Sequence, residues 1–221
     1  MNTLIITADG SHSIASDTFN ETYHSVNGAL NESRHVFIEA GLNYLIGQGR
    51  KGVSILEIGF GTGLNAYLTL IEAENQNLKV QYCGIDAYPI QSNIWKQLNY
   101  PEILNYSPEL FYLLHAQLPS THFKVITPNF SFSKIIAKIE AIDISDSFDL
   151  IYFDAFAPTT QPELWDESVL QKLYNSLNSG GILVTYCAKG SFKRALKSVG
   201  FMDERLPGAA GKREMTRAIR I

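Results

Sequence analysis

Three groups of residues in this chain have the types and spacing expected of a site for a nucleotide-like ligand. The first is ILEIGFGTGLN at residues 55–65, where three alternating glycines follow an apolar run that contains Glu57. Glycines after a buried strand let the backbone approach a ligand closely, and the N–H groups that open the next helix can bind it. A dinucleotide-binding fingerprint has glycine where this chain has Leu64, so the pattern favours another nucleotide-like ligand.

The other two groups are acids that follow apolar runs. Asp86 ends KVQYCGID at residues 79–86, and Asp154 follows FDLIYF at residues 148–153. The carboxyl ends of parallel strands meet at one edge of a sheet, where ligands bind, so we expect both acids to lie there with Glu57. Asp86 is then predicted to accept hydrogen bonds from the hydroxyls of a ribose, and Asp154 is predicted to lie beside the reacting centre. The alternative for each acid is a turn-forming role ahead of a nearby proline.

Strand and helix patterns alternate along most of the chain. Strands are predicted at 53–58, 79–85, 122–126, 148–153, 182–187, 201–206 and 215–221, with helices at 64–73 and near 91–98, 108–117, 133–140, 166–177 and 190–199. Strands that are apolar on both faces are typical of a parallel sheet covered by helices. The last two strands are joined by about eight residues, too few for a parallel crossover, which predicts an antiparallel closing hairpin.

The first 50 residues have a different pattern and are expected to form an extension packed on a single compact unit, residues 51–221. Apolar stretches at 3–7 and about 11–15 flank Asp9-Gly10, a dipeptide typical of tight hairpin turns. Between residues 31 and 45, apolar side chains recur at helical spacing. The prediction for this region is a small hairpin followed by one amphipathic helix.

Composition limits the class of protein. The chain has 221 residues, a net charge of -4 and 45% hydrophobic residues, which fits one globular domain. Cys83 and Cys187 lie in separate apolar runs without a CxxC or Cys/His cluster, so neither a zinc site nor a disulfide framework is expected. The amino terminus lacks the pattern of a secretory signal, and no apolar run reaches the length of a membrane span. We therefore expect a cytoplasmic protein that binds neither a metal nor a membrane.

Charge is distributed unevenly along the chain. Residues 1–188 contain 9 basic and 19 acidic side chains, whereas residues 189–221 contain 9 basic and 3 acidic ones. A solvated helix face with a salt-bridged last strand explains this asymmetry, and so does an edge that contacts the phosphates of a nucleic acid. Composition leaves both explanations open.

Five motifs together resemble one known family. GFGTGLN at 59–65 looks like motif I of S-adenosylmethionine-dependent methyltransferases. With DAFAP at 154–158, QPELW at 161–165, GKREM at 211–215 and the segment YHSVNGALNESRHVFIEAGL at 23–42, it resembles the methyltransferase half of the MnmC family. That family makes 5-methylaminomethyl-2-thiouridine at the wobble position of tRNA. The likeness covers most of residues 9–217 and implies an α/β, Rossmann-like class I methyltransferase fold, with a seven-stranded, mostly parallel sheet whose last strand is antiparallel.

The resemblance also implies a cofactor and its contacts. The binding site for S-adenosyl-L-methionine would be lined by Glu57, Gly59, Phe60, Gly61, Gly63 and Asn65. Asp86 would bind the ribose, and Asp154 would lie where cofactor and substrate meet. The family usually has Glu in place of Asp86, and commonly has Gly-Asp where this chain reads TPNF at 127–130. Asn129 is therefore expected to face the adenine amino group. Bifunctional members carry a further FAD-dependent oxidase domain; this chain resembles the stand-alone form, so no FAD is expected.

The implied reaction is N-methylation of the 5-aminomethyl group of the wobble uridine. The nitrogen gains positive charge during transfer, so a neighbouring anion stabilises the transition state, and Asp154 is the predicted catalytic residue. An unpaired anticodon base can stack on aromatic side chains. Tyr23, His24, Phe156 and Trp165 are candidate walls for the base, although each residue type also occurs in packed cores. Lys212 and Arg213 are predicted to contact tRNA phosphates.

Other functions remain open at this stage. A methyltransferase or aminopropyltransferase of the same fold that acts on a small molecule would suit the acidic body of the chain. A nucleotide-binding subunit without catalysis would be expected to have a damaged glycine turn or to lack Asp154, and both are intact. A nicotinamide oxidoreductase is disfavoured by Leu64. The expected partner is tRNA, with no obligate protein partner indicated.

Overall fold

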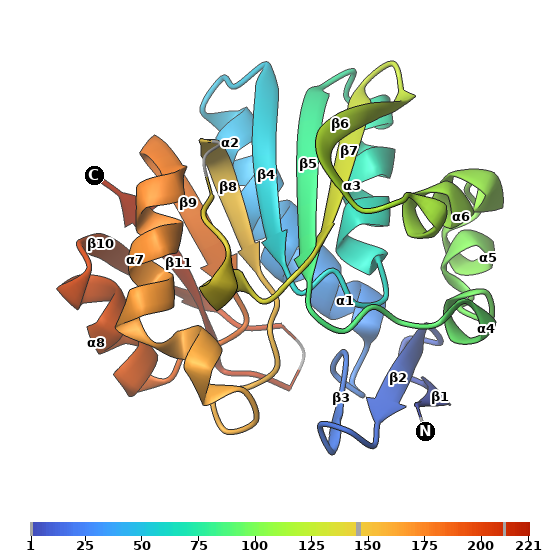
Figure 1. Ribbon diagram of the computed structural model, residues 1–221, viewed down its shortest axis with the longest axis horizontal. Helices are drawn as coiled ribbons and strands as arrows, with labels where there is room; N and C mark the ends of the chain where they lie inside the picture. The colour runs from blue at the N-terminus through green and yellow to red at the C-terminus, as the bar shows by residue number, and fades with distance from the viewer. Residues whose placement is uncertain (1, 145–146, 210) are drawn as a thin grey trace.

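The computed structural model describes residues 2–144, 147–209 and 211–221, and its centre is an eight-stranded mixed sheet (Figure 1). The strands are β4 (Gly52–Ile58), β5 (Lys79–Asp86), β6 (Ser120–Thr127), β7 (Phe130–Ile136), β8 (Phe148–Phe153), β9 (Leu177–Thr185), β10 (Phe201–Pro207) and β11 (Glu214–Arg220). Their spatial order is β10-β11-β9-β8-β4-β5-β7-β6. The five strands from β9 to β7 are parallel, and β6, which pairs with β7, and β11 are antiparallel to their neighbours.

Helices cover both faces of this sheet. They are α1 (Ala29–Ser33), α2 (Tyr44–Gly47), α3 (Leu64–Asn75), α4 (Ser92–Trp95), α5 (Tyr100–Leu104), α6 (Pro108–Ala116), α7 (Glu167–Ser176) and α8 (Gly190–Ser198). A π-helix, η1 (Arg34–Asn43), joins α1 to α2, and short 3₁₀ helices lie at η2 (Ile139–Ala141) and η3 (Pro162–Trp165). Figure 1 shows α7 and α8 on one face, with α1, α2 and α3 on the other.

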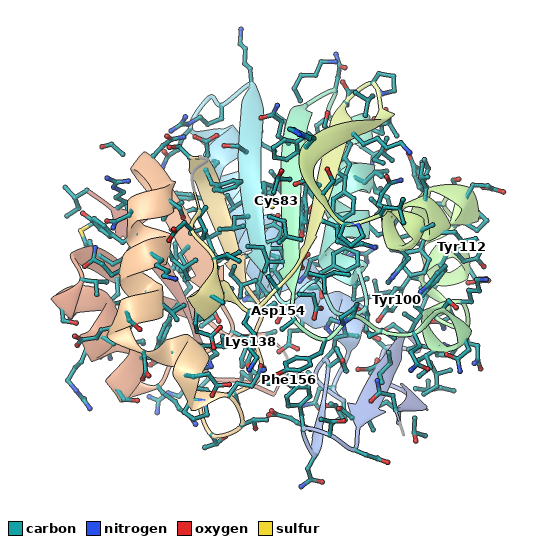
Figure 2. The ribbon with its side chains drawn as sticks, viewed as in Figure 1. Cys83, Tyr100, Tyr112, Lys138, Asp154 and Phe156 are labelled. Carbon is teal, nitrogen blue, oxygen red and sulfur yellow. The ribbon has the colours of Figure 1, made fainter. Side chains whose placement is uncertain are left out.

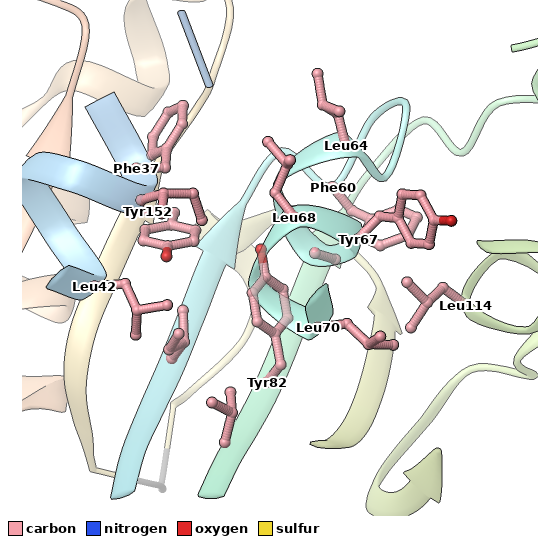
Figure 3. Packing of buried hydrophobic residues seen from close by; sticks show 14 of the residues in the cluster. Phe37, Leu42, Phe60, Leu64, Tyr67, Leu68, Leu70, Tyr82, Leu114 and Tyr152 are labelled. Atoms are coloured by element: carbon pink, nitrogen blue, oxygen red, sulfur yellow. The ribbon is translucent and has the colours of Figure 1, made fainter. Parts of the chain in front are cut away.

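The central strand β8 shows why both faces need a cover. All six of its residues, FDLIYF, are buried. Because side chains alternate along a strand, Leu150 and Tyr152 join the core under η1 and α3, while Ile151 and Phe153 join the core under α7 and α8. Figure 3 shows part of the first core, where the ring centroids of Tyr152 and Phe37 lie 5.1 Å apart. The two cores fix the strand ends that carry the site.

A small antiparallel sheet lies against the carboxyl ends of the central strands, at the bottom of Figure 1. It contains β1 (Thr3–Ile6), β2 (His12–Ser16) and β3 (Glu21–Thr22), and β1 pairs with β2 around the predicted turn. The hydroxyl of Tyr100 donates a hydrogen bond to the backbone oxygen of His12 at 2.9 Å, which ties this sheet to the main body. The predicted hairpin is confirmed, and the third strand is an addition to it. The division of the chain at residue 50 stays a proposal.

The predicted class of fold is confirmed, including the antiparallel last strand, but the strand count was wrong. The first half of residues 133–140, predicted as a helix, belongs to β7, which pairs with β5 from Phe130 to Ile136. The window that starts at residue 133 has apolar residues at helical spacing, whereas the alternation that marks the strand begins at Phe130. The strand also buries Lys134, whose ammonium donates a hydrogen bond to the backbone oxygen of His115 at 2.6 Å. This long-range contact is invisible to a local pattern.

Candidate active site

A cavity of about 340 Å³ lies at the carboxyl ends of the central strands, beneath the small N-terminal sheet. The ends of four parallel strands and the residues after them supply its floor: Ile58, Gly59 and Gly61 at the end of β4, residues 85–88 at the end of β5, 137–140 after β7 and 154–156 after β8. Residues 19–26 of the N-terminal sheet form the facing wall. Figure 2 shows Lys138, Asp154 and Phe156 gathered at this end of the sheet. The sequence predicted this edge as the site, and the cavity lies there.

The glycine turn after β4 can approach its surroundings only because its side chains are missing. Gly59 and Gly61 have φ angles of +91° and +49°, in the left-handed region that side chains disfavour. A Cβ on Gly59 would collide with the backbone oxygen of Asp154, and one on Gly61 would lie 3.0 Å from a ring carbon of Tyr23. Gly63 precedes the first residue of α3 and also has a positive φ, of +73°. The turn therefore brings backbone atoms directly against two cavity residues.

Asp86 ends β5 as predicted and holds the glycine turn in place. Its Oδ2 accepts a hydrogen bond from the N–H of Gly61 at 2.7 Å, and its Oδ1 accepts one from the N–H of Tyr88 at 2.7 Å. Burial raises the pKa of this carboxyl group. Each carboxylate oxygen can accept a second hydrogen bond, so Asp86 keeps the capacity for ribose hydroxyls.

Glu57, Asn65 and Asp154 form a hydrogen-bonded group beneath and beside the turn. The Nδ2 atom of Asn65 donates to Oε1 of Glu57 at 3.0 Å and to Oδ2 of Asp154 at 2.8 Å. Burial, and then the neighbouring charge of Asp154, raise the pKa of Glu57 well above its usual range, so we treat Glu57 as neutral. Glu57 lies under the cavity and does not line it. Its connection to the cavity runs through Asn65.

Asp154 is the carboxylate of this group that lines the cavity. Burial and, second, the charge of Glu32 raise its pKa to about 7, against the opposing effects of Asn65 and Lys212. Asn65 occupies Oδ2, and no residue that the structure describes donates a hydrogen bond to Oδ1. Asp154 therefore offers one free oxygen to a ligand, at the strand end where the sequence predicted it.

Two predicted cofactor residues lie elsewhere. The side chain of Phe60 packs in the core, with its ring centroid 5.3 Å from that of His115, so only its backbone belongs to the turn. Asn129 precedes β7, at the amino end of that strand, where its Oδ1 accepts a hydrogen bond from Nζ of Lys79 at 2.9 Å. This position is at the opposite end of the sheet from Asp86 and does not fit contact with an adenine. The error follows from the missed strand.

The segment after β7, and not Asn129, lies at the cavity next to Asp86. The N–H of Ala137 donates a hydrogen bond to the backbone oxygen of Asp86 at 3.1 Å, and residues 137–140 line the cavity. This segment lies beside the predicted ribose position. Recognition of β7 in the sequence as a parallel strand next to β5 would have predicted residues 137–140 as cavity residues.

Aromatic side chains line the wall opposite the glycine turn. The rings of Tyr23 and Phe156 meet edge to face with centroids 5.0 Å apart, and Phe19 stacks on Phe156 at 4.6 Å. Burial raises the pKa of Tyr23 to about 12, so its hydroxyl stays protonated. Trp165 is buried behind this wall and donates a hydrogen bond to the backbone oxygen of Phe156 at 2.9 Å. Two of the predicted walls, Tyr23 and Phe156, thus lie together at the cavity.

His24 has partners that point to a structural role. Its Nε2 forms a hydrogen bond with the hydroxyl of Thr62 at 2.7 Å, and its backbone N–H donates a hydrogen bond to the hydroxyl of Ser13 at 3.1 Å. Burial lowers the pKa of His24 to about 4, so the ring is neutral at neutral pH. Although it borders the cavity, His24 chiefly ties the N-terminal sheet to the glycine turn.

Lys212 and Arg213, predicted to act together, are separated by the structure. Arg213 is exposed, whereas the side chain of Lys212 lines the cavity and forms an ion pair with Glu32 of α1. The ammonium of Lys212 also lies 3.9 Å from the ring centroid of Tyr186. Glu32 and Tyr186 were not predicted as cavity residues, since neither is next in sequence to an acid at the end of a strand.

The cavity as a whole is acidic. Its lining contains six carboxyl groups and two ammonium groups: Glu21, Glu32, Asp86, Glu140, Asp154, Glu163, Lys138 and Lys212. Such a lining favours cationic ligands over phosphates. Within residues 2–144, 147–209 and 211–221, no group of three or more His, Cys, Asp or Glu side chains could hold a metal ion. The helices of the described segments include none that is long and apolar enough to span a membrane.

Sheet order, glycine turn and strand-end acids together define a Rossmann-like α/β protein that binds a nucleotide-type ligand at the carboxyl ends of its strands. More specifically, the chain belongs to a family of S-adenosyl-L-methionine-dependent methyltransferases, which matches residues 102–221.

Curated relatives carry the name that the motifs predicted. The chain is 31% identical over 212 residues to the tRNA 5-methylaminomethyl-2-thiouridine biosynthesis bifunctional protein MnmC of Leptospira borgpetersenii, covering 90% of this chain and 32% of the relative. It is 29% identical over 232 residues to the protein of the same name from Aromatoleum aromaticum, covering 97% and 34%. The resemblance to the MnmC methyltransferase half is confirmed. The chain spans about a third of the length of these relatives.

Solved structures share the fold. The crystal structure of MNMC2 from Aquifex aeolicus superposes with a TM-score of 0.82 at 24% identity, covering all of this chain and 70% of that one. Spermidine synthase from Thermotoga maritima superposes with a TM-score of 0.57 at 13% identity, covering 99% and 68%. At these identities the likeness establishes the architecture alone.

Proposed function

We propose that this chain catalyses S-adenosyl-L-methionine-dependent N-methylation of the 5-aminomethyl group of the wobble uridine in tRNA, giving 5-methylaminomethyl-(2-thio)uridine. The observation that carries the proposal is Asp154, whose backbone lies against the glycine turn and whose carboxylate lines the cavity, with no described residue donating a hydrogen bond to Oδ1. The names of the curated relatives support the choice of substrate. We also propose that the protein works in the cytoplasm, on tRNA as its partner.

The residues at the cavity fit the cofactor of the family. The tight turn at Gly59 and Gly61 would offer backbone atoms at close range, Asp86 would offer carboxylate oxygens to ribose hydroxyls, and residues 137–140 would border the adenine. The acidic lining suits a ligand that carries a sulfonium cation. When bound, the cofactor supplies an electrophilic methyl group.

Asp154 has the properties that transfer to an amine requires. Its Oδ1 can accept a hydrogen bond from the amine and hold the nitrogen in line for attack. As the nitrogen becomes positive, the ionised carboxylate interacts with it more strongly, and burial enhances this effect because water screens it less. Asn65, which is itself fixed by Glu57, prevents the carboxylate from rotating away. The chain thus holds a pre-positioned anion at the acceptor side of the cavity.

We propose that the uracil base packs against aromatic side chains. Phe156 lies two residues after Asp154, and the ring of Tyr23 packs edge to face against the ring of Phe156. A base beside these rings would present its 5-substituent toward the carboxylate of Asp154. The exposed side chain of Arg213 remains our candidate for a tRNA phosphate contact, and Lys212 no longer is one.

The test is transfer of labelled methyl groups to tRNA from cells that lack this chain. We expect mass spectrometry of the nucleosides to show conversion of 5-aminomethyl- to 5-methylaminomethyl-(2-thio)uridine by the wild type and not by Asp154→Asn. A parallel reaction with decarboxylated cofactor and putrescine tests aminopropyl transfer. Product there, with unmodified tRNA left unchanged, would reject the proposed function.

A further inference from the structure

Lys212 is turned inward in a way that solvation alone does not explain. It lies in the loop between β10 and β11, yet its side chain is only 34% exposed and lines the cavity. The carboxylate of Glu32 holds its ammonium from one side and the ring of Tyr186 from another. An ammonium has three N–H groups, so this arrangement leaves donor capacity for a ligand.

The partners of Lys212 are themselves fixed. Glu32 is 7% exposed, and its second oxygen accepts a hydrogen bond from the N–H of Ser25 at 2.9 Å. The hydroxyl of Tyr186 donates to the backbone oxygen of Ala155 at 2.8 Å, one residue beyond Asp154. The ammonium is therefore held in one place beside the end of β8.

Sheet order gives the cavity two ends. Asp86 follows β5, Asp154 follows β8, and the glycine turn follows β4, which lies between those two strands. A ligand with its ribose on Asp86 that crosses the glycine turn must bring its other end to the β8 side. For S-adenosylmethionine that other end is the amino acid portion, which would then lie beside Lys212.

The amino acid portion carries a carboxylate, which an acidic cavity disfavours unless a cation faces it. Lys138 is the other lysine of the described lining, but it is exposed and follows β7, the strand beyond β5. Lys212 is the cation at the β8 end, where Asp154, Glu32 and Glu163 would otherwise repel the carboxylate.

We propose that Lys212, positioned by Glu32 and Tyr186, binds the α-carboxylate of S-adenosylmethionine and makes the cavity selective for the carboxylated cofactor over its decarboxylated form. This inference rests on the cofactor of the proposed function and not on its RNA substrate. Aminopropyl transfer requires the decarboxylated cofactor, so a cation at this place also favours methyl transfer over that alternative.

Calorimetric titration of the full chain with two ligands tests the proposal. One is S-adenosylhomocysteine, and the other is its decarboxylated analogue, which keeps the amino group and loses only the carboxylate. A charge-assisted hydrogen bond corresponds to about a 10- to 100-fold difference in affinity. We expect wild type to bind S-adenosylhomocysteine tighter by about this factor. Lys212→Met should lose this preference or favour the decarboxylated ligand, because the carboxylates of Glu32, Asp154 and Glu163 then repel the carboxylate of S-adenosylhomocysteine.

Two further variants complete the design. Lys138→Met is the matched control and should keep the wild-type ratio of affinities. The double variant Glu32→Gln with Lys212→Met removes both charges of the ion pair, so it avoids an unpaired carboxylate at Glu32 and should also show no preference for S-adenosylhomocysteine.

The outcomes separate this inference from the proposed function. Equal binding of the two ligands by wild type, or an unchanged ratio in Lys212→Met, would overturn the role of Lys212. Discrimination that depends on Lys212 in a chain that fails to methylate tRNA would leave this inference standing and reject the RNA substrate alone.

Discussion

Replacing Asp154 by asparagine is expected to stabilise the folded protein at pH 8 while removing most of its activity. Burial raises the pKa of Asp154 from 3.8 to about 7, so the folded state favours the protonated form. The contribution of this group to stability is complete below about pH 3.8 and is lost as the pH rises through about 7. Above that pH the ionised carboxylate costs stability that asparagine does not.

The size of the effect follows from the shift. About three pKa units at roughly 1.4 kcal/mol each give an upper limit of about 4 kcal/mol, and water in the cavity reduces it. Asparagine can still accept the hydrogen bond from Asn65, so no donor is left unpaired. We expect a gain of about 1 to 4 kcal/mol at pH 8, which raises Tm by roughly 2 to 16 °C for a chain of this size.

The assay is thermal unfolding of the ligand-free protein at pH 5 and pH 8. Asp149→Asn, on the strand that ends just before Asp154, is a matched control, because Asp149 is also buried but accepts hydrogen bonds from Ser54 and pairs with Arg50 at 3.2 Å. That variant should lose about 1 to 3 kcal/mol. An Asp154→Asn protein that is no more stable than wild type at pH 8, or that gains equally at pH 5, would refute the reasoning.

The kcat/KM for methylation should rise with pH through about 7, where Asp154 becomes ionised, and a flat profile between pH 6 and 8.5 would contradict its role as the anion. Gly59→Ala should weaken S-adenosylhomocysteine binding at least about 10-fold in titration, because its Cβ meets the backbone oxygen of Asp154. Phe156→Ala should raise KM for tRNA about 5- to 100-fold and leave S-adenosylhomocysteine affinity unchanged, as expected for a stacking wall. Arg213→Ala should weaken tRNA binding and reduce the slope of log affinity against log salt by about 1; an unchanged slope would place the phosphate contact elsewhere.

The part of the fold that could be predicted is the part with local patterns. Buried strands such as FDLIYF, the glycine turn and the short link before the last strand each carry their signal within a few residues. The helix prediction for residues 133–140 was wrong because the helical spacing of a short apolar window competed with strand alternation. Pairing with β5, together with a backbone partner for Lys134 far away in the sequence, decided the outcome in favour of a strand.

The same distinction holds for the site. The turn at Gly59 and the strand-end acids Asp86 and Asp154 could be predicted from the sequence, because parallel strands necessarily bring their carboxyl ends to one edge. The inward direction of Lys212 toward Glu32, 180 residues away, could be known only from the folded chain, because an ion pair between distant segments depends on how helices and loops pack around the sheet. The prediction for Asn129 was wrong because β7 was not predicted, and Asn129 lies at the amino end of that strand, at the opposite end of the sheet from Asp86.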